Sequence, residues 1–319
     1  MTASSQGPLR LDDADIARLL TPAAAADAVE AVLRDGLDPE SCPPRTHVTV
    51  PAGQLLLMPA AAGTYAGVKI AGVAPGNPAR GLPRITGSYL LLDGETLVPL
   101  ALLDGAALTA LRTPAVSAVA LRHLAAPDAG HAVLFGAGPQ AYGHLEAALA
   151  ERPLTRVTVV APRREPAEEL VAHARKLGLE ARTGTPGDVA DADLVLCCTT
   201  AREPLFDGRL VPDHATVIAV GSHEPDARET DTMLVRRSAV YVEARTAAFR
   251  EAGDLIIPAT EGAFGPDRIT GTLAELVRGR AVAAAGCPQL FKSVGMAWED
   301  LAVAAAVHRA AMTKPGSAT

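Results

Sequence analysis

The chain has 319 residues, of which 49% are hydrophobic and 20% are charged, and its formal net charge is −7. This length is sufficient for two domains with a sizeable core, and the composition is typical of a soluble globular protein. The negative charge argues against nucleic acid or an anionic membrane as a partner. The aromatic content of 3% also argues against stacking platforms for bases.

The N-terminal stretch MTASSQGPLRLDD contains no apolar core of a signal peptide, and no window is long and apolar enough to span a membrane. The cysteines Cys42, Cys197, Cys198 and Cys287 have the spacing of neither a zinc site nor a disulfide framework. We therefore expect a cytoplasmic protein without a metal site.

The pattern from Asp12 to Leu37 is helical, and Thr21 and Pro22 fit an N-cap followed by proline at the first helical position. Residues 46–103 consist of short apolar runs interrupted by Gly and Pro, which predicts an antiparallel or mixed sheet. A helix is predicted to follow, from about Ala106 to His123.

From His131 onward the sequence alternates between strand and helix patterns. Helices are predicted at 139–150 and 166–177, and strands at 131–135, 155–161, 179–182, 193–197, 215–220 and 239–243. This alternation is typical of βαβ units and of a parallel sheet with helices on both faces. A last helix is predicted from about Trp298 to Met312, and we expect it to pack on the first part of the chain.

The stretch VLFGAGPQAYG, residues 133–143, has the pattern of a nucleotide-binding turn between a strand and a helix. Gly136 would permit the tight turn, and Gly138 would let the backbone approach a pyrophosphate at the helix N-terminus. Ala141 stands where the third glycine of the motif is expected. The alternative interpretation is a glycine-rich turn without a ligand.

The second strand of this region ends at Ala161 and Pro162 and is followed by Arg163 and Arg164. An NAD site usually has an acid at the end of this strand to accept from the ribose hydroxyls, whereas guanidinium groups suit a 2′-phosphate. We therefore favour NADP(H) over NAD(H). Glu165 keeps NAD(H) open, and both arginines could instead be solvated residues at a helix start.

Three cations occupy unusual positions in the first part of the chain. Lys69 lies within the apolar stretch AGVKIAGV, Arg112 lies in a largely apolar helical pattern, and Arg45 follows two prolines. Because an unpaired buried charge is costly, each cation needs a partner. That partner is either an anionic ligand or a structural salt bridge.

Several segments together resemble the ornithine cyclodeaminase/mu-crystallin family. They are PPRTHV at 43–48, LLMP at 56–59, VKIAGVAPGNPARGLPRITG at 68–87, LRTPAVSA at 111–118, GAGPQA at 136–141, VGSHEPDARETD at 220–231 and LFKSVGMAWEDLA at 290–302. Each motif is modest, but their order and spacing are specific, and the resemblance covers nearly the whole chain.

The resemblance implies an α/β fold with a Rossmann-type doubly wound parallel sheet and a second, α+β domain. Residues 1–118, completed by a C-terminal helix at about 298–319, would form a substrate-binding and dimerisation domain. Residues 119–297 would form the dinucleotide-binding domain. It also implies a homodimer that acts on a small α-imino or α-amino acid.

The resemblance further implies which residues form the site. Arg45, Lys69 and Arg112 match the cations that hold the substrate carboxylate, and the backbone at Val294 is expected to touch substrate. The residues expected at the cofactor are Thr86, Arg112, Thr113, Gly136, Gly138, Pro139, Gln140, Arg163, Arg164, Thr199, Val220, Gly221 and Ser293. The hydroxyls of Thr86 and Thr113 could donate to phosphate, or could finish a strand or cap a turn.

Two positions depart from the cyclodeaminases of the family. Those enzymes carry a Glu where this chain has Leu56, and an Asp where it has His223. An acid that accepts a proton from the distal amine is central to ring closure, because only the neutral amine is a nucleophile. The absence of both acids therefore argues against ornithine cyclodeamination.

His223 and Lys69 are the candidate catalytic residues for proton transfer. A histidine has an ordinary pKa of about 6.5, and burial would lower the pKa of a lysine. His223 could instead be a loop residue that contacts the cofactor amide. Asp226 and Glu229 could also serve as acids, but the sequence PDARE suits the N-terminus of a short helix as well, where carboxylates meet the helix dipole.

These features predict an NAD(P)H-dependent reductase of an α-imino acid of the ketimine or Δ1-pyrroline-2-carboxylate type, or the reverse L-amino acid dehydrogenase. One alternative is an ornithine or lysine cyclodeaminase that retains NAD and releases ammonia. The other is a non-catalytic NADPH-binding protein similar to mu-crystallin.

Overall fold

The computed structural model describes residues 7–313 of the chain. Its backbone contacts divide into two compact units. The first unit contains the chain up to Ala115 and again from Met296 onward, and the second contains Val116–Gly295. The division falls inside helix α3 (Gly105–Leu124).

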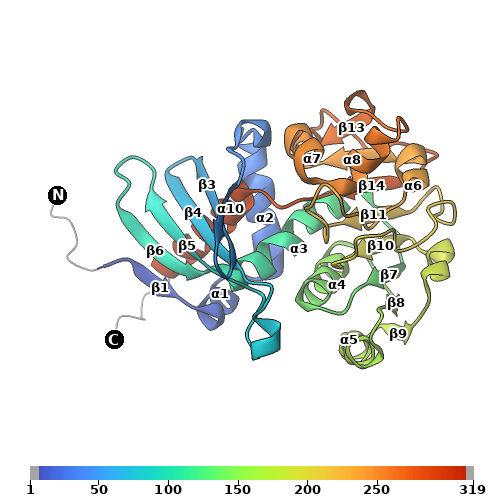
Figure 1. The fold of residues 1–319 in the computed structure, drawn as a ribbon, viewed down its shortest axis with the longest axis horizontal. Coiled ribbons are helices and arrows are strands. Elements are labelled where there is room, and N and C mark those ends of the chain that lie inside the picture. The colour runs from blue at the N-terminus through green and yellow to red at the C-terminus, as the bar shows by residue number, and fades with distance from the viewer. Residues whose placement is uncertain (1–6, 314–319) are drawn as a thin grey trace. The chain divides into compact units, whose positions relative to one another are not determined.

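The first unit is built on a six-stranded sheet in the order β1-β6-β5-β4-β3-β2 (Figure 1). Neighbouring strands pair antiparallel, apart from β1, which runs parallel to β6, so the expected mixed sheet is confirmed. The strands are β1 (Leu9–Leu11), β2 (Thr46–Val50), β3 (Gly53–Ala62), β4 (Tyr65–Val73), β5 (Ile85–Asp93) and β6 (Pro99–Asp104). Its helices, besides the start of α3, are α1 (Asp13–Leu19), α2 (Pro22–Arg34) and α10 (Ala297–Thr313).

Thr21 and Pro22 divide the N-terminal helical pattern into α1 and α2. The Thr21 side chain accepts a hydrogen bond from the Ala24 N–H at 3.2 Å, and Pro22 occupies the first helical position. Proline disfavours helical geometry in the residue before it, which is why one helix cannot run through this point.

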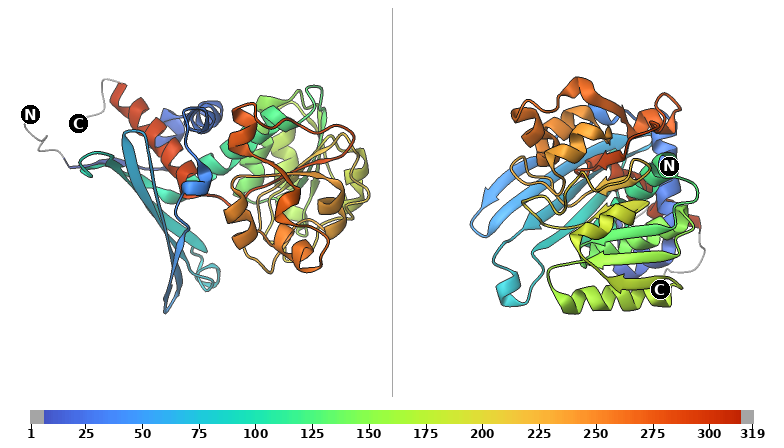
Figure 2. Two further views of the ribbon diagram at one scale, coloured as in Figure 1. Left: turned by 90° about the horizontal axis from the view of Figure 1, so that it is seen from above. Right: turned by 90° about the vertical axis from the view of Figure 1, so that its right-hand side faces the viewer.

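Helix α10 packs on the sheet of its own unit, as expected from the sequence. It contacts β3, β4 and α2, and Figure 2 shows it lying along one face of the sheet. Met58, Lys69, Tyr89 and Leu103 form one row across four strands, and all four are buried. Because paired residues share a face, these side chains line the face that α10 covers.

The second unit contains an eight-stranded parallel sheet in the order β13-β12-β14-β11-β10-β7-β8-β9 (Figure 1). The strands are β7 (His131–Phe135), β8 (Arg156–Val160), β9 (Glu180–Thr183), β10 (Leu194–Cys197), β11 (Thr216–Ala219), β12 (Ala239–Val242), β13 (Ile269–Thr272) and β14 (Gln289–Lys292). The helices are α4 (Pro139–Glu151), α5 (Arg164–Lys176), α6 (Thr232–Arg237), α7 (Arg245–Glu251), α8 (Gly253–Thr260) and α9 (Leu273–Val277).

The strand order reverses between β7 and β10, so this is the Rossmann-type doubly wound sheet that the sequence predicted. The predicted strands at 131–135, 193–197, 215–220 and 239–243 correspond to fully buried strands of the sheet. Strand β14 is a difference from the sequence interpretation, because no strand was predicted after 239–243. Residues 289–292 form instead a strand between β11 and β12, and only Ser293 onward leaves the sheet.

Candidate active site

Lys69 is a buried cation in the middle of β4. Its Nζ donates to Oδ1 of Asp300 at 2.9 Å and to Oγ1 of Thr109 at 3.3 Å, and it lies 2.8 Å from Oδ2 of Asp300. The side chain is 5% exposed. Burial lowers the pKa of Lys69 to about 8, although the adjacent Asp300 carboxylate opposes that shift. A lysine in this state is charged at neutral pH but can release its proton within an accessible range of pH.

Arg112 lies beside Lys69 and contacts the same helix. Its Nη1 donates to Oε2 of Glu299 at 2.5 Å, and its Nε lies 3.4 Å from Oδ1 of Asp300. Glu299 also accepts from the Met296 N–H at 2.8 Å through Oε1. Both acids lie in the first turn of α10, where the helix dipole favours negative charge.

The two cations and two carboxylates form a cluster that is balanced in charge. The sequence left two possible partners open for Lys69 and Arg112, and the structure shows that salt bridges to Asp300 and Glu299 are present. Ion pairing does not preclude anion binding, because a guanidinium group carries five N–H donors and an ammonium three. The pairing instead lets both cations remain charged when buried.

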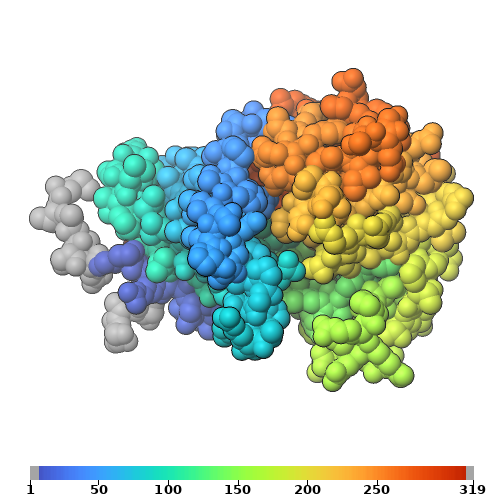
Figure 3. Space-filling model, in the orientation of Figure 1, coloured from blue at the N-terminus to red at the C-terminus, as the bar shows by residue number. Residues whose placement is uncertain are grey.

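Arg45 immediately precedes β2, an edge strand with mostly exposed residues, and the blue part of the chain to which they belong reaches the surface in Figure 3. Thr46 pairs with Leu57, and Met58 pairs with Lys69. Arg45 therefore lies one residue beyond the paired part of the sheet, next to the strand that carries Met58. Its expected place beside Lys69 stays a prediction.

Two other side chains on the α10-facing side of the sheet define the surroundings of Lys69. Leu56 is buried two positions from Met58 and therefore shares its face, so the position at which the resemblance implies a Glu in cyclodeaminases carries an apolar side chain here. Tyr89 pairs directly with Lys69 and is fully buried. Burial raises the pKa of Tyr89 well above its ordinary value, and Asp300 adds to that effect.

The turn after β7 has the geometry expected for the glycine motif. Gly136 adopts a φ of +103°, and a Cβ there would lie 2.5 Å from the carbonyl oxygen of Cys198. Gly138 is the N-cap of α4 and Pro139 follows as its first residue, with Gln140 next in the first turn. A Cβ at Gly138 would meet no atom of residues 7–313 within 4 Å, so the space beside this N-cap is open.

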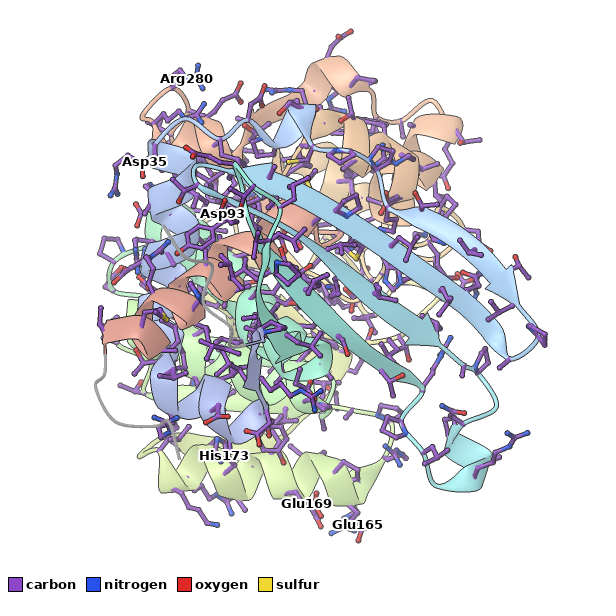
Figure 4. The ribbon with its side chains drawn as sticks, turned by 90° about the vertical axis from the view of Figure 1, so that its left-hand side faces the viewer. Asp35, Asp93, Glu165, Glu169, His173 and Arg280 are labelled. Carbon is purple, nitrogen blue, oxygen red and sulfur yellow. The ribbon has the colours of Figure 1, made fainter. Side chains whose placement is uncertain are left out.

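Arg163 and Arg164 lie at the start of α5, and both are exposed. Nε of Arg164 donates to Glu168 at 2.7 Å, one turn further along the same helix. Arg163 has no hydrogen-bond partner within the part of the chain that is described. Glu165 is also in the first turn of α5, and Figure 4 shows its side chain directed outward from the helix.

The other predicted cofactor residues of the second unit follow β10, β11 and β14. Thr199 lies two residues after β10, Val220 and Gly221 follow β11 directly, and Ser293 follows β14. Val294 comes next and is buried, as is Ser293. In a parallel sheet these positions share one edge, at the carboxyl ends of the strands, where doubly wound folds bind their ligands.

Thr86 and Thr113 belong to the first unit and occupy regular structure. Thr86 is the second residue of β5 and is exposed. Thr113 lies inside α3, and its hydroxyl donates to the Thr109 carbonyl at 2.9 Å. The suggestion that either residue finishes a strand or caps a turn is therefore wrong, while their expected contacts with the cofactor stay a prediction.

His223 lies in the loop after β11 and is exposed. The neighbouring acids do not have the role that the sequence suggested, because α6 begins at Thr232 and is capped by Asp231. Asp226 is exposed and pairs with Arg202, whereas Glu229 is fully buried. The interpretation of Asp226 and Glu229 as carboxylates at a helix N-terminus is therefore wrong.

Residues 7–313 contain neither a candidate metal site nor a helix suited to cross a membrane. No group of three or more His, Cys, Asp or Glu side chains in that range is arranged to hold a metal ion. No helix within the same range is both long and apolar enough to cross a membrane.

Comparison with known proteins identifies the family. The model of the ornithine cyclodeaminase/mu-crystallin family matches residues 10–314. The chain belongs to this family. The resemblance inferred from the sequence motifs is thereby confirmed, and it extends over both units.

Relatives and solved structures support this assignment. The chain is 35% identical over 232 residues to Δ1-pyrroline-2-carboxylate reductase of Colwellia psychrerythraea, covering 71% of this chain and 73% of that protein. The structure of Thermococcus litoralis Δ1-pyrroline-2-carboxylate reductase with NADH and L-proline has a TM-score of 0.90 and 32% identity, with 95% and 97% of the two chains covered. An archaeal alanine dehydrogenase dimer with bound NAD has a TM-score of 0.91 and 27% identity, with 98% of each chain covered.

Proposed function

We propose that this protein is an NAD(P)H-dependent reductase of an α-imino acid of the ketimine or Δ1-pyrroline-2-carboxylate type, and that in reverse it is an L-amino acid dehydrogenase. The observation that carries the proposal is the buried pair of cations, Lys69 and Arg112, in a family member with relatives named as reductases of such substrates. A substrate carboxylate is the natural ligand for such a pair.

The second unit fits a nicotinamide dinucleotide. Gly136 and Gly138 leave the N-terminus of α4 open to a pyrophosphate. Pro139 has no N–H at the first helical position, where an N–H would have no partner within the helix. When bound, the nicotinamide supplies a hydride to the imine carbon or accepts one from Cα of an amino acid.

The residues of this chain would bind and orient the substrate and control the protonation of its imine nitrogen. Arg45, Lys69 and Arg112 hold the carboxylate, which fixes the α-carbon in position. Lys69 and His223 are the candidates to protonate the imine nitrogen or to keep it protonated. Lys69 is suited to this role because a pKa of about 8 leaves it mostly protonated at neutral pH. Since this value is lower than the ordinary 10.5, Lys69 also releases its proton more readily than an exposed lysine.

The cofactor specificity that we propose is NADP(H) over NAD(H). Arg163 is exposed at the end of the turn after β8 without a protein partner among the described residues, so it is available to a 2′-phosphate. Arg164 already pairs with Glu168, which makes it the weaker candidate. Glu165 remains the acid through which NAD(H) would be preferred.

We also propose that the enzyme is a homodimer, with the first unit as its substrate-binding and dimerisation domain. The sheet face opposite α10 exposes Val48, Ile70 and Leu102 at 41%, 44% and 38%, and in Figure 2 none of the described helices of the first unit lies on that face. An exposed apolar face of this kind marks an association surface. The second unit is proposed as the dinucleotide-binding domain, and a cytoplasmic location stays a prediction.

The experiment that tests this function follows NADPH and NADH absorbance with Δ1-pyrroline-2-carboxylate and with larger cyclic ketimines, while ammonia release from ornithine and lysine is assayed in parallel. We expect stoichiometric oxidation of the cofactor with a cyclic imino acid. Ammonia release without net oxidation would replace the proposal with a cyclodeaminase. Tight NADPH binding without turnover would replace it with a non-catalytic binding protein.

A further inference from the structure

Two glutamates in the second unit are buried at the carboxyl end of the parallel sheet, and the proposed chemistry does not use them. Glu229 is fully buried and Glu243 is 1% exposed. We propose that Glu229 and Glu243 are positioning residues that hold the loops of the nicotinamide half of the cofactor site through hydrogen bonds to their backbones. The proposal rests on the proposed function in requiring a nicotinamide dinucleotide as the ligand.

Glu229 joins two loops that are far apart in the sequence. Its Oε1 accepts from the Thr199 N–H at 2.8 Å and from the Thr199 hydroxyl at 2.7 Å. Its Oε2 accepts from the Gly221 N–H at 2.7 Å. One carboxylate therefore fixes the loop after β10 against the loop after β11.

The backbone of Glu229 is itself held in place by a buried ion pair. Oδ1 of Asp254 accepts from the N–H groups of Glu229 and Thr230, at 2.9 and 2.8 Å. Oδ2 of Asp254 lies 3.0 Å from Nζ of Lys292, which also donates to the Ser222 carbonyl at 2.7 Å. The chain of contacts thus runs from β14 through Asp254 to Glu229 and leaves the carboxylate little freedom to move.

Glycines let the same loops pack closely. A Cβ at Gly221 would lie 2.0 Å from the carbonyl oxygen of Thr199 and 2.5 Å from Oε1 of Glu229. A Cβ at Gly136 would lie 2.5 Å from the carbonyl oxygen of Cys198, which also belongs to the loop after β10. Because neither glycine can gain a side chain without displacing backbone, the loops after β7, β10 and β11 form one packed layer.

Glu243 has the equivalent role for the loop after β14. It directly follows β12, and its carboxylate accepts from the Ser293 hydroxyl at 2.7 Å and from the Val294 N–H at 2.8 Å. The Gly295 N–H is shared between both oxygens at 3.2 Å. All three donors belong to the segment in which Ser293 and Val294 are proposed to meet cofactor and substrate.

The topology indicates which half of the cofactor these loops would meet. A doubly wound sheet binds a dinucleotide across the point where the strand order reverses, with one nucleotide on each side. The glycine turn after β7 and the arginines after β8 belong to the adenosine side. Strands β10, β11 and β14 lie on the other side, so the loops held by Glu229 and Glu243 belong to the nicotinamide side.

The substitution of Glu by Gln should have different effects at positions 229 and 243. A carboxylate only accepts hydrogen bonds, whereas a carboxamide has one accepting and one donating end. At position 229 either orientation of a Gln directs its NH2 group at a backbone N–H, of Thr199 or of Gly221. At position 243 the NH2 group can face the Ser293 hydroxyl, which can accept instead of donating, while the oxygen still faces Val294.

The experiment measures the dissociation constants of NADH and of ADP-ribose, which lacks the nicotinamide, for wild type, Glu229→Gln and Glu243→Gln. Glu151→Gln is the matched control, because Glu151 is a shielded glutamate of the same unit that pairs with Arg122 away from these loops. We expect Glu229→Gln to weaken NADH binding about tenfold and Glu243→Gln no more than about threefold. ADP-ribose binding should stay within about twofold in every variant, and Glu151→Gln should leave both ligands unaffected.

Gly221→Ala provides a second route if Glu229→Gln does not fold. It keeps the glutamate side chain but crowds the Thr199 carbonyl and Oε1 of Glu229, which displaces the same loop, and we expect the same selective loss of NADH binding. NADH binding at the wild-type level in Glu229→Gln and Gly221→Ala would overturn the inference, as would an equal loss of NADH and ADP-ribose. A wild type that binds NADH but reduces no imino acid would overturn the proposed function alone, because the binding comparison does not depend on turnover.

Discussion

Each unit buries a cluster of charged side chains, and the two clusters are satisfied in different ways. In the first unit, Lys69 and Arg112 are matched by the carboxylates of Asp300 and Glu299. In the second unit, the carboxylates of Glu229 and Glu243 accept mainly from backbone N–H groups. Side-chain ion pairs can rearrange around an incoming anion, whereas carboxylates bonded to backbone fix the loops that carry those donors. The first cluster therefore suits substrate binding and the second suits positioning.

Lys292→Met is expected to have the largest effect on stability. Lys292 is 1% exposed and pairs with Asp254, so its removal leaves a buried carboxylate without its cation. Breaking a buried pair from one side costs roughly 3–5 kcal/mol. Chemical denaturation should show a loss of this size in the free energy of unfolding. A loss below about 1 kcal/mol would mean that backbone donors alone satisfy Asp254.

Arg112→Met tests the substrate role of the first cluster. It removes a guanidinium that we propose holds the substrate carboxylate, so we expect kcat/KM for the imino acid to fall by about a hundredfold, since charged hydrogen bonds contribute roughly 1.5–3 kcal/mol each. Because Arg112 is also expected at the cofactor, the dissociation constant of NADH should rise as well, but by a much smaller factor than kcat/KM falls. Arg112→Lys retains the charge and should recover part of kcat/KM. Equal losses for substrate and cofactor would erase the distinction between the two clusters.

The lowered pKa of Lys69 predicts opposite effects of pH on substrate binding and on the stability of the fold. Its pKa is about 8 in the folded protein against an ordinary value of 10.5, and the charged groups around it are Asp300, Glu299 and Arg112. KM for the imino acid should rise above pH 8 as the cation is lost. The contribution of Lys69 to stability should increase as pH rises from about 8 to 10.5, because the unfolded chain binds the extra proton there.

Lys69→Arg provides the control for that titration, since its guanidinium stays charged over the same range. Its KM should be nearly independent of pH between 7 and 9, apart from any titration of the substrate. A pH dependence of KM that persists in Lys69→Arg would assign the titration to another group.

Arg163→Ala is expected to have the smallest effect of these substitutions. It should change only the preference between NADPH and NADH. Loss of an exposed guanidinium that meets a 2′-phosphate should weaken NADPH binding about tenfold and NADH binding less than about twofold. Arg164→Ala is the matched comparison, and we expect a smaller change because Arg164 pairs with Glu168. Equal affinities of NADPH and NADH in the wild type would contradict the proposed preference.

The strands of the second unit show which parts of the fold could be predicted from the sequence. The buried strands β7, β10, β11 and β12 were recognisable because a parallel strand covered on both faces is a short apolar run. Strand β14 was missed because its four residues include Gln289 and Lys292, and only its neighbours β11 and β12 make it a strand.

The site was predictable as a set of residue types but not as a set of pairs. Lys69 and Arg112 stood out because cations are rare in apolar stretches. Their partner Asp300 is 231 positions from Lys69, and its place in the acidic start of the last helix was the only local signal. Glu229 was misinterpreted because its partners are backbone N–H groups of Thr199 and Gly221, which carry no mark in the sequence.

The most direct test of the central claim is the transfer of deuterium from NADPH or NADH labelled at C4 to Δ1-pyrroline-2-carboxylate. We expect proline with deuterium at Cα, formed in the same amount as the cofactor that is oxidised. In Arg112→Met, both the formation of this product and the affinity for the substrate should fall. Proline formed from ornithine with release of ammonia, and with no net oxidation of the cofactor, would contradict it.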